Sequence, residues 1–253
     1  AQHINRDSYY GGGQDLNAYG NTTDLNWMAG SQYVYSFGKC IFMPSDLTAG
    51  IEFNQDKLED NMWGYHRTVD QKVNIGSAFL QNEWKNDHWG FLLGGRLDKH
   101  NLIDHIIFSP RANLRFNPTQ NINLRLSYSS GFRAPQAFDE DMHIENVGGT
   151  VAMIERAKDL KEEKSQSFSA SADMYHRFGA FQTNLLVEGF YTRLTDVFVL
   201  GEPFDRGDGV LVKIRSNGPG AKVMGLTLEG KIAYLSLLQI QAGLTLQRSR
   251  YDV

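Results

Sequence analysis

Residues 131–149, GFRAPQAFDEDMHIENVGG, bring acidic, imidazole, cationic and aromatic side chains together without a regular period. Carboxylates are hard oxygen ligands of the kind that Ca²⁺ prefers, but their spacing here does not match a calcium-binding helix–loop–helix. The carboxylates in question are Asp139, Glu140, Asp141 and Glu145. The competing interpretation is a solvated acidic loop. We therefore expect no resident cofactor and no defined metal site, with Ca²⁺ as the one ion that this loop could hold.

Two further groups in the same stretch could contact a ligand. Arg133 could bind an anionic group, or it could pair with Asp139 or Glu140 and pack against the strand ends. His143 could reach a metal centre or haem, although a single imidazole without a second ligand is weak evidence for a metal.

A second candidate stretch is NMWGYHR, residues 61–67, in which Trp63, Tyr65 and His66 lie close together. Aromatic faces of this kind stack on planar or sugar-like ligands, and they also anchor proteins at interfaces. Spacing alone nominates no nucleophile with a matching base, so we expect no enzymatic activity.

Charge and cysteine content exclude several classes of function. The formal net charge of -4 and the pI near 6.0 provide no basic stripe for nucleic acid. Cys40 is the only cysteine, so neither an intramolecular disulfide nor a thiolate zinc cluster is expected. We therefore expect a partner other than nucleic acid.

Apolar and polar residues alternate along most of the chain, which is the period of a β-strand. In NINLRLSYSS, for example, Leu124 and Leu126 fall on one face while Asn123 and Arg125 fall on the other. Ten strands are predicted, over about residues 23–37, 47–53, 69–84, 89–98, 108–116, 122–128, 165–178, 181–200, 210–234 and 238–251.

The connections between these strands alternate between short and long. Short ones are predicted at 38–45, 85–88, 117–120, 179–180 and 234–235, and long ones at 55–68, 99–105, 131–164 and 201–209. The Asn217–Gly220 segment reads locally as a turn, but a reversal there would break this alternation. We therefore interpret 210–234 as one strand with a Gly/Pro bulge, because Pro cannot donate to a ladder.

This alternation is typical of an antiparallel up-and-down transmembrane β-barrel. Aromatic residues cluster near the short connections, as at a lipid–water interface, and include Trp84, Trp89, Phe178, Phe181 and Tyr234. No apolar run reaches about 18 residues, so no membrane-spanning helix and no signal peptide are expected. A soluble β-sandwich is the alternative, because its strands also alternate.

Residues 108–135, FSPRANLRFNPTQNINLRLSYSSGFRAP, resemble the barrel signature of TonB-dependent outer-membrane receptors. The similarity continues through DLKEEKSQSF (159–168), GFYTRLTDVF (189–198) and NGPGAKVMGL (217–226). Members of this family have an N-terminal plug, a segment that engages TonB and a barrel of about twenty-two strands. The resemblance therefore implies that 1–253 is a fragment of such a barrel, without the plug and the TonB-engaging segment, in which 1–22 is an extracellular loop or tail and 131–164 a long extracellular loop.

The same resemblance implies a function. It predicts TonB-dependent uptake of a scarce nutrient across the outer membrane of a Gram-negative bacterium, with an iron chelate, cobalamin or haem as cargo. Its partners would be outer-membrane lipid, TonB and the small-molecule nutrient. A soluble carbohydrate-binding sandwich and an outer-membrane barrel enzyme are the alternative functions.

Overall fold

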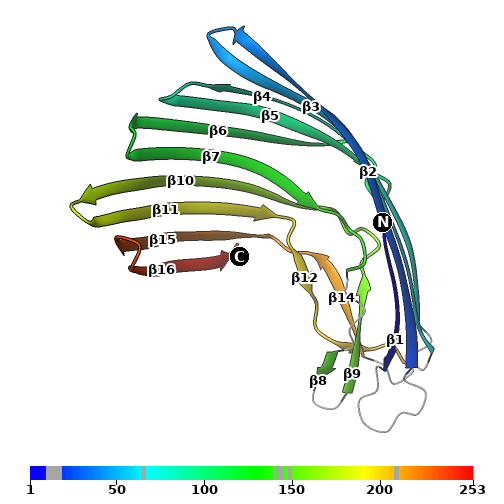
Figure 1. The fold of residues 1–253 in the computed structure, drawn as a ribbon. Helices are drawn as coiled ribbons and strands as arrows, with labels where there is room; N and C mark the ends of the chain where they lie inside the picture. The colour runs from blue at the N-terminus through cyan, green and yellow to red at the C-terminus, as the bar shows by residue number, and fades with distance from the viewer. Residues whose placement is uncertain are drawn as a thin grey trace.

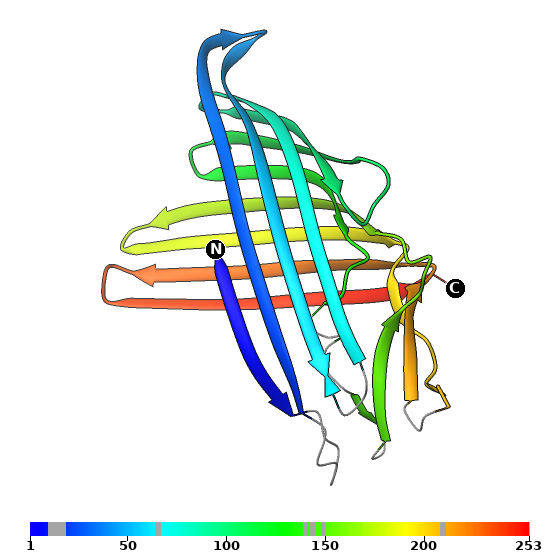
Figure 2. The ribbon, with the colours of Figure 1, turned by 90° about the vertical axis from the view of Figure 1, so that its right-hand side faces the viewer.

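The computed structural model describes residues 1–9, 19–63, 67–138, 141, 145–147, 150–207 and 211–252. In this part of the chain, eleven strands form one antiparallel sheet that curves around a concave side (Figures 1 and 2). In spatial order they are β1 (Gln2–Tyr9), β2 (Tyr19–Cys40), β3 (Met43–Met62), β4 (Arg67–Lys85), β5 (Trp89–His100), β6 (Ile107–Thr119), β7 (Ile122–Arg133), β10 (Glu163–Phe178), β11 (Phe181–Thr195), β15 (Gly220–Tyr234) and β16 (Leu238–Tyr251). No helix among the described residues is long and apolar enough to cross a membrane.

The predicted up-and-down barrel wall is confirmed, and the β-sandwich interpretation is wrong. All short turns lie along one edge of the sheet, between β2 and β3, β4 and β5, β6 and β7, β10 and β11, and β15 and β16 (Figure 1). The longer connections lie at the opposite ends of the strands. Gly179 and Leu235 adopt positive φ values of 58° and 48° in two of the short turns, as tight reversals require.

The wall differs from the prediction in its extent. Residues 2–9, expected in a loop or tail, form β1 and pair with β2 from Gln2 opposite Asn26 to Tyr9 opposite Tyr19, so the wall has eleven strands instead of ten. Most of the loop expected at 55–68 is strand, since β3 runs to Met62 and β4 begins at Arg67. Polar residues occupy most positions of both segments, and on the inner face of the β3 extension Leu58 and Met62 alternate with Asp56 and Asp60, so no continuous apolar face marks them. Backbone hydrogen bonds to the neighbouring strand hold them in place instead.

Five short strands form a second sheet beside the long-loop ends of the wall (Figures 1 and 2). They are β8 (Glu145–Val147), β9 (Thr150–Arg156), β12 (Phe198–Leu200), β13 (Phe204–Asp205) and β14 (Leu211–Asn217). β9 and β14 pair in parallel, and β12 and β13 pair antiparallel with β14. The long loop predicted at 131–164 thus contains strands of its own.

Two predicted single strands are therefore each divided between the two sheets. The strand expected at 181–200 leaves the wall after β11, at Asp196, whose φ is 55°. The strand expected at 210–234 is β14 in the second sheet followed by β15 in the wall. No hairpin forms at Asn217–Gly220, and β11 pairs directly with β15, so the predicted alternation of strand direction is preserved.

The two faces of the wall differ in chemistry. The outer face carries Leu124, Leu126, Ile240 and Leu244, which are between 37% and 56% exposed. The inner, concave face carries polar pairs such as Arg125 with Asn123 (2.8 Å) and Gln241 with Glu229 (2.5 Å). Leu124 and Leu126 thus share one face, and Asn123 and Arg125 share the other, as the alternation predicts.

Aromatic rings gather at the short-turn end, as predicted. Ring centroids lie 4.2 Å apart for Trp89 and Phe116, 5.4 Å for Phe178 and Phe181, and 5.0 Å for Phe181 and Tyr234. Such a band of aromatic residues is typical of the interface level of a membrane barrel.

Gly50 on β3 is required by a close approach on the inner face. The Phe79 ring from β4 covers it, and a Cβ atom there would overlap this ring and lie 2.9 Å from the Ser31 carbonyl oxygen. A Cβ atom on Gly76 of β4, by contrast, would meet no heavy atom within 4 Å.

Buried apolar residues concentrate at the long-loop end, where the second sheet and the segment after β7 cover the inner face of the wall. They include Leu58, Met62 and Val73 from the wall, Ala134 and Ala137 from the segment after β7, and Ala152, Met153, Ile154 and Val212 from the second sheet. This small core holds the second sheet against β3 and β4. It also surrounds a network of polar contacts made by Arg67, Gln71 and Asp141.

Candidate functional site

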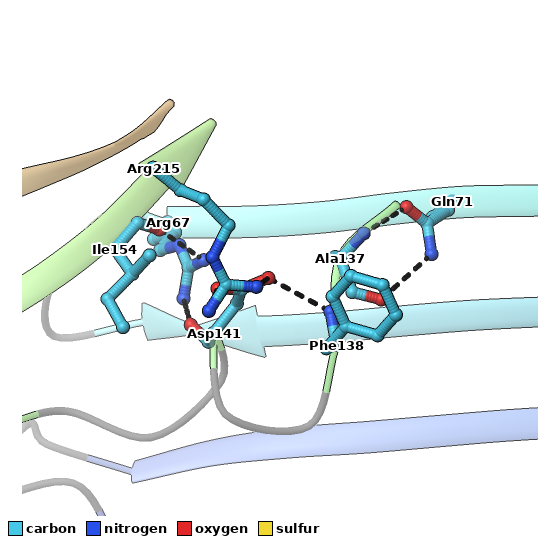
Figure 3. A network of polar contacts seen from close by, with 7 residues as sticks. All are labelled: Arg67, Gln71, Ala137, Phe138, Asp141, Ile154 and Arg215. Atoms are coloured by element: carbon cyan, nitrogen blue, oxygen red, sulfur yellow. Dashed lines mark hydrogen bonds and ion pairs between the residues drawn. The ribbon is translucent and has the colours of Figure 1, made fainter. Parts of the chain in front are cut away.

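Two side chains on the inner face of β4 hold the segment that follows β7. Arg67 donates to the carbonyl oxygens of Asp141 and Ile154, both at 2.9 Å (Figure 3). Gln71 accepts a hydrogen bond from the Ala137 amide (2.6 Å) and donates to the Ala137 carbonyl oxygen (3.3 Å). The wall thereby recognises the backbone of this segment and of β9.

A buried ion pair joins the same segment to the second sheet. Both guanidinium NH2 groups of Arg215, on β14, lie 3.0 Å from the carboxylate oxygens of Asp141. The two side chains are 6% and 2% exposed. Asp141 Oδ2 also accepts a hydrogen bond from the Phe138 amide at 2.9 Å (Figure 3). A bidentate arginine–carboxylate pair fixes the relative orientation of its two side chains in addition to the electrostatic attraction between them.

Arg133, the last residue of β7, stacks on aromatic rings. Its guanidinium carbon lies 3.9 Å from the centroid of the Phe138 ring and 5.5 Å from that of Phe198. A cation over an aromatic face is attracted by about 0.5–2 kcal/mol. This contact ties the end of the wall strand to both inserted segments.

A cavity of about 530 Å³ lies between β4 and the inserted segments. Its charged lining residues are Arg67, Asp141, Glu155, Arg156 and Lys158. Asp141 is paired with Arg215, and Glu155 lies 3.3 Å from Arg206. Arg156 and Lys158 form no ion pair with any described residue, although one NH2 group of Arg156 donates to Gln71 Oε1 (2.9 Å) and to the Pro135 carbonyl oxygen (3.2 Å). The cavity is therefore polar and has an excess of positive charge.

A carboxylate at the base of the long insertion is held by a lysine and a histidine. Glu162 lies 3.0 Å from both Lys164 and His105. Burial raises the pKa of Glu162, but a backbone hydrogen bond and the neighbouring Lys164 and His105 outweigh burial, so the pKa is lowered from its ordinary value.

The sequence-predicted candidates have different surroundings. Trp63 follows β3 and is 60% exposed, available to a ligand or an interface. For Asp141 the solvated-loop interpretation is wrong, because its carboxylate is buried against Arg215. Tyr65, His66, Asp139, Glu140 and His143 lie outside the described residues, and only the backbone of Glu145 is described, in β8. Within the described residues, no three His, Cys, Asp or Glu side chains are grouped to hold a metal ion, so Ca²⁺ binding in this loop stays a prediction.

The sequence did not predict a role for Gln71, Arg156 or Arg215. Arg67 lies at the end of the candidate stretch 61–67, but it was not itself a predicted site residue. One signal was available for Gln71, because it occupies an inner-face position beside Val69 and Val73 on a strand. A long polar side chain on that face suggests a partner inside the barrel. Arg215 gave no such signal, since its strand belongs to a sheet that the sequence did not reveal.

Comparison with known proteins identifies the family and the fold. The family described as "TonB dependent receptor-like, beta-barrel" matches residues 1–253. A comparison with curated protein sequences finds no match.

Three solved structures show the same fold at low sequence identity. The siderophore receptor PirA from Pseudomonas aeruginosa is 16% identical, with a TM-score of 0.77 over 91% of this chain and 44% of that one. The FrpB iron transporter from Neisseria meningitidis is 14% identical, with a TM-score of 0.65 over 92% of this chain and 36% of that one. The outer membrane transporter YddB from Escherichia coli is 11% identical, with a TM-score of 0.68 over 91% of this chain and 34% of that one.

The chain thus spans less than half the length of these solved relatives. The match of the family to every residue, the up-and-down wall and the aromatic band at its short turns lead to the same conclusion. This chain belongs to the family of TonB-dependent receptor-like β-barrels.

Proposed function

We propose that this chain forms part of the wall and the ligand-binding face of an outer-membrane receptor that imports an anionic iron chelate. The family match supports a receptor and transporter role over an enzymatic one, and it supports TonB as the energising partner. Two of the solved structures with this fold are named a siderophore receptor and an iron transporter. The outer membrane of a Gram-negative bacterium is the corresponding location.

The positive charge of the cavity beside β4 is the observation that favours an anionic chelate. Its two acidic side chains are neutralised by Arg215 and Arg206, whereas Arg156 and Lys158 retain their charge. Catecholate chelators form an anionic ferric complex, because each catecholate group contributes two negative charges and three such groups exceed the charge of Fe³⁺. Hydrogen bonds to charged partners contribute about 1.5–3 kcal/mol each.

Haem is less well matched by this cavity. A flat apolar ring system requires aromatic or aliphatic walls, but none of the described residues that line the cavity is aromatic. Cobalamin is also disfavoured, because a cationic cavity offers little to a cargo without strong negative charge. An iron chelate therefore fits the described lining best.

The inserted segments have distinct roles in this proposal. Asp141 and Arg133 act as positioning residues, since both are used in contacts that hold the insert against the wall. Ligand contact is assigned to Arg156 and Lys158, with Trp63 at the exposed end of β3. Ligand contact by Tyr65, His66, Asp139, Glu140, His143 and Glu145 remains a prediction from the sequence.

The test is an uptake assay in a Gram-negative strain that lacks its other iron-chelate receptors and expresses this receptor from its own gene. Radioactive iron is supplied as a catecholate chelate, as a hydroxamate chelate or as haem, and labelled cobalamin is supplied separately. We expect uptake of the catecholate chelate, whose ferric complex is anionic, and we expect this uptake to depend on TonB. Uptake of the neutral hydroxamate chelate alone would contradict an anionic cargo. Uptake of haem or cobalamin alone, or uptake that persists without TonB, would contradict the proposal.

The matched variants are Arg156→Gln/Lys158→Gln at the cavity and Lys39→Gln/Arg177→Gln near the short turns. Both pairs remove two exposed cations. We expect the cavity pair to raise the chelate concentration for half-maximal uptake by at least tenfold, because each lost charged hydrogen bond is worth about 1.5–3 kcal/mol. The control pair should leave this concentration unchanged, and an equal effect of both pairs would refute a local site.

A further inference from the structure

Gln71, on the inner face of β4, connects the wall to two inserted segments at once. Its side chain is buried, with the residue 5% exposed. Oε1 accepts a hydrogen bond from the Ala137 amide at 2.6 Å, and Nε2 donates to the Ala137 carbonyl oxygen at 3.3 Å (Figure 3). The same Oε1 accepts a second hydrogen bond, at 2.9 Å, from Nη1 of Arg156 at the end of β9. The backbone of Ala137 thus fixes Gln71 as an acceptor for this guanidinium.

Arg156 is held at both ends of its side chain. It is the last residue of β9 and lies opposite Arg215 in the parallel pairing of β9 with β14. The Ala157 amide donates to the Arg215 carbonyl oxygen at 2.9 Å, which fixes the backbone beside Arg156. At the other end, Nη1 donates to Gln71 and, at 3.2 Å, to the Pro135 carbonyl oxygen. The guanidinium is therefore oriented before any ligand arrives.

One edge of the Arg156 guanidinium is left for a ligand. The group has five N–H donors, and the two on Nη1 are used by Gln71 and Pro135. The donors on Nε and Nη2 form no hydrogen bond with any residue that the structure describes. Nε and Nη2 share one edge of the planar group, and such an edge binds two oxygen atoms of an anion at once. The contacts of Nη1 thus leave open the edge that is suited to bidentate binding.

The other charged groups that line the cavity are bound or shaped differently. Both terminal nitrogens of Arg67 donate to backbone carbonyl oxygens. The carboxylate of Asp141 is engaged by Arg215 at 3.0 Å, so it does not occupy Arg156. Lys158 carries an ammonium group, which is a point charge without a planar pair of donors. Among the described lining residues, Arg156 is therefore the cation suited to a pair of oxygen atoms.

We propose that Gln71 is a positioning residue for ligand binding. By holding Nη1 of Arg156, it presents the Nε–Nη2 edge to the cavity, where that edge binds the two adjacent oxygen atoms of one catecholate group of the chelate. This inference rests on the proposed function, and it adds how the anion is recognised. Gln71 does not itself line the cavity, so it acts through Arg156 and not by touching the ligand.

The test is equilibrium binding of a radioactive ferric catecholate chelate to outer-membrane vesicles that contain the full receptor. Gln71→Met keeps a similar side-chain volume and removes the acceptor of Arg156. The matched control is Gln136→Met, which removes the 3.3 Å hydrogen bond between the same inserted segment and His100 but affects neither Arg156 nor the cavity lining. We expect Gln71→Met to raise Kd about tenfold, as the loss of one hydrogen bond to a charged group does. The control should raise Kd less than about threefold.

A double variant separates positioning from a general structural role. Arg156→Lys keeps the positive charge but has no paired edge, so its Kd should also rise about tenfold. In Gln71→Met/Arg156→Lys, Kd should stay within about threefold of that of Arg156→Lys, because Gln71 then has no guanidinium edge to orient. If Gln71 acted only on the fold, the two effects would multiply to about a hundredfold.

Three results would overturn the role of Gln71: an unchanged Kd in Gln71→Met, an equal rise in Gln136→Met, or multiplied effects in the double variant. The amount of chelate bound at saturation reports the folded receptor in each preparation. If Gln71→Met does not fold, Gln71→Asn, whose amide is one methylene shorter and no longer reaches both partners, should show the same rise, and an unchanged Kd there would be equally decisive. Absence of chelate binding to the unaltered receptor would contradict the proposed function and this inference with it, whereas binding that the Gln71 variants leave unchanged contradicts this inference alone.

Discussion

Replacement of Arg215 by Met tests whether the buried ion pair holds the inserted sheet against the wall. Met fills a similar volume and removes the guanidinium, so Asp141 keeps its hydrogen bond from the Phe138 amide but loses both contacts to Arg215. Removing one partner of a buried pair costs about 3–5 kcal/mol, because the other charge stays buried. The wall itself should remain folded, since its ladders do not include β14.

The expected effect is therefore local. A loss of about 3 kcal/mol in the opening free energy of the insert speeds amide exchange by about a hundredfold, at about 1.4 kcal/mol per factor of ten. Hydrogen exchange measured by mass spectrometry should show this acceleration in peptides that cover β9 and β14. Peptides from β10 and β11 should exchange as in the unaltered receptor.

Glu155→Gln is the matched control for Arg215→Met. It breaks the contact of Glu155 with Arg206 on the same small sheet, but those side chains are 45% and 33% exposed, and exposed pairs are worth about 0–1 kcal/mol. The rate of amide exchange in the peptides that cover β9 and β14 should then rise less than about fivefold. If Arg215→Met behaves like Glu155→Gln, the ion pair does not hold the insert, and the assignment of Asp141 as a positioning residue is wrong.

Three other predictions concern the wall and the base of the insert. Leu126→Arg should prevent assembly in the outer membrane, because an arginine facing lipid costs about 2–4 kcal/mol, whereas Ser127→Arg on the inner face should assemble; equal amounts of both in isolated outer membranes would contradict the assignment of faces. Gly50→Ala should destabilise the folded barrel by about 1–3 kcal/mol through overlap with the ring above it, while Gly76→Ala, with open space at its Cβ, should be neutral in urea unfolding. The lowered pKa of Glu162 means that its contribution to stability is present above the pKa of the unfolded state and is lost as the pH falls through the lower, folded-state value. Relative to Glu162→Gln, the unaltered receptor should thus be more stable at neutral pH and lose that advantage in acid, and a constant difference across the titration would refute the ion pairing.

Much of the wall was determined by the sequence alone. The period of two places Leu124 and Leu126 on one face whatever the rest of the chain does, because successive side chains of a strand point to opposite sides. The strict alternation of short and long connections then determines strand direction, and it correctly excluded a hairpin at Asn217–Gly220. These signals are local, so a single sequence carries them.

Only the tertiary structure decided where the inserted segments go. Asp141 and Arg215 are far apart in the sequence, and nothing local distinguishes a solvated carboxylate from one that a distant arginine buries. β1 and the last residues of β3 carry no continuous apolar face, because polar residues occupy most of their positions, so their pairing with neighbouring strands is what shows that they are strands. In each case the stabilising contact joins residues that are distant in the sequence. It is either the backbone pairing of two strands or the pairing of a buried charge, and its partner is in reach only once the chain has folded.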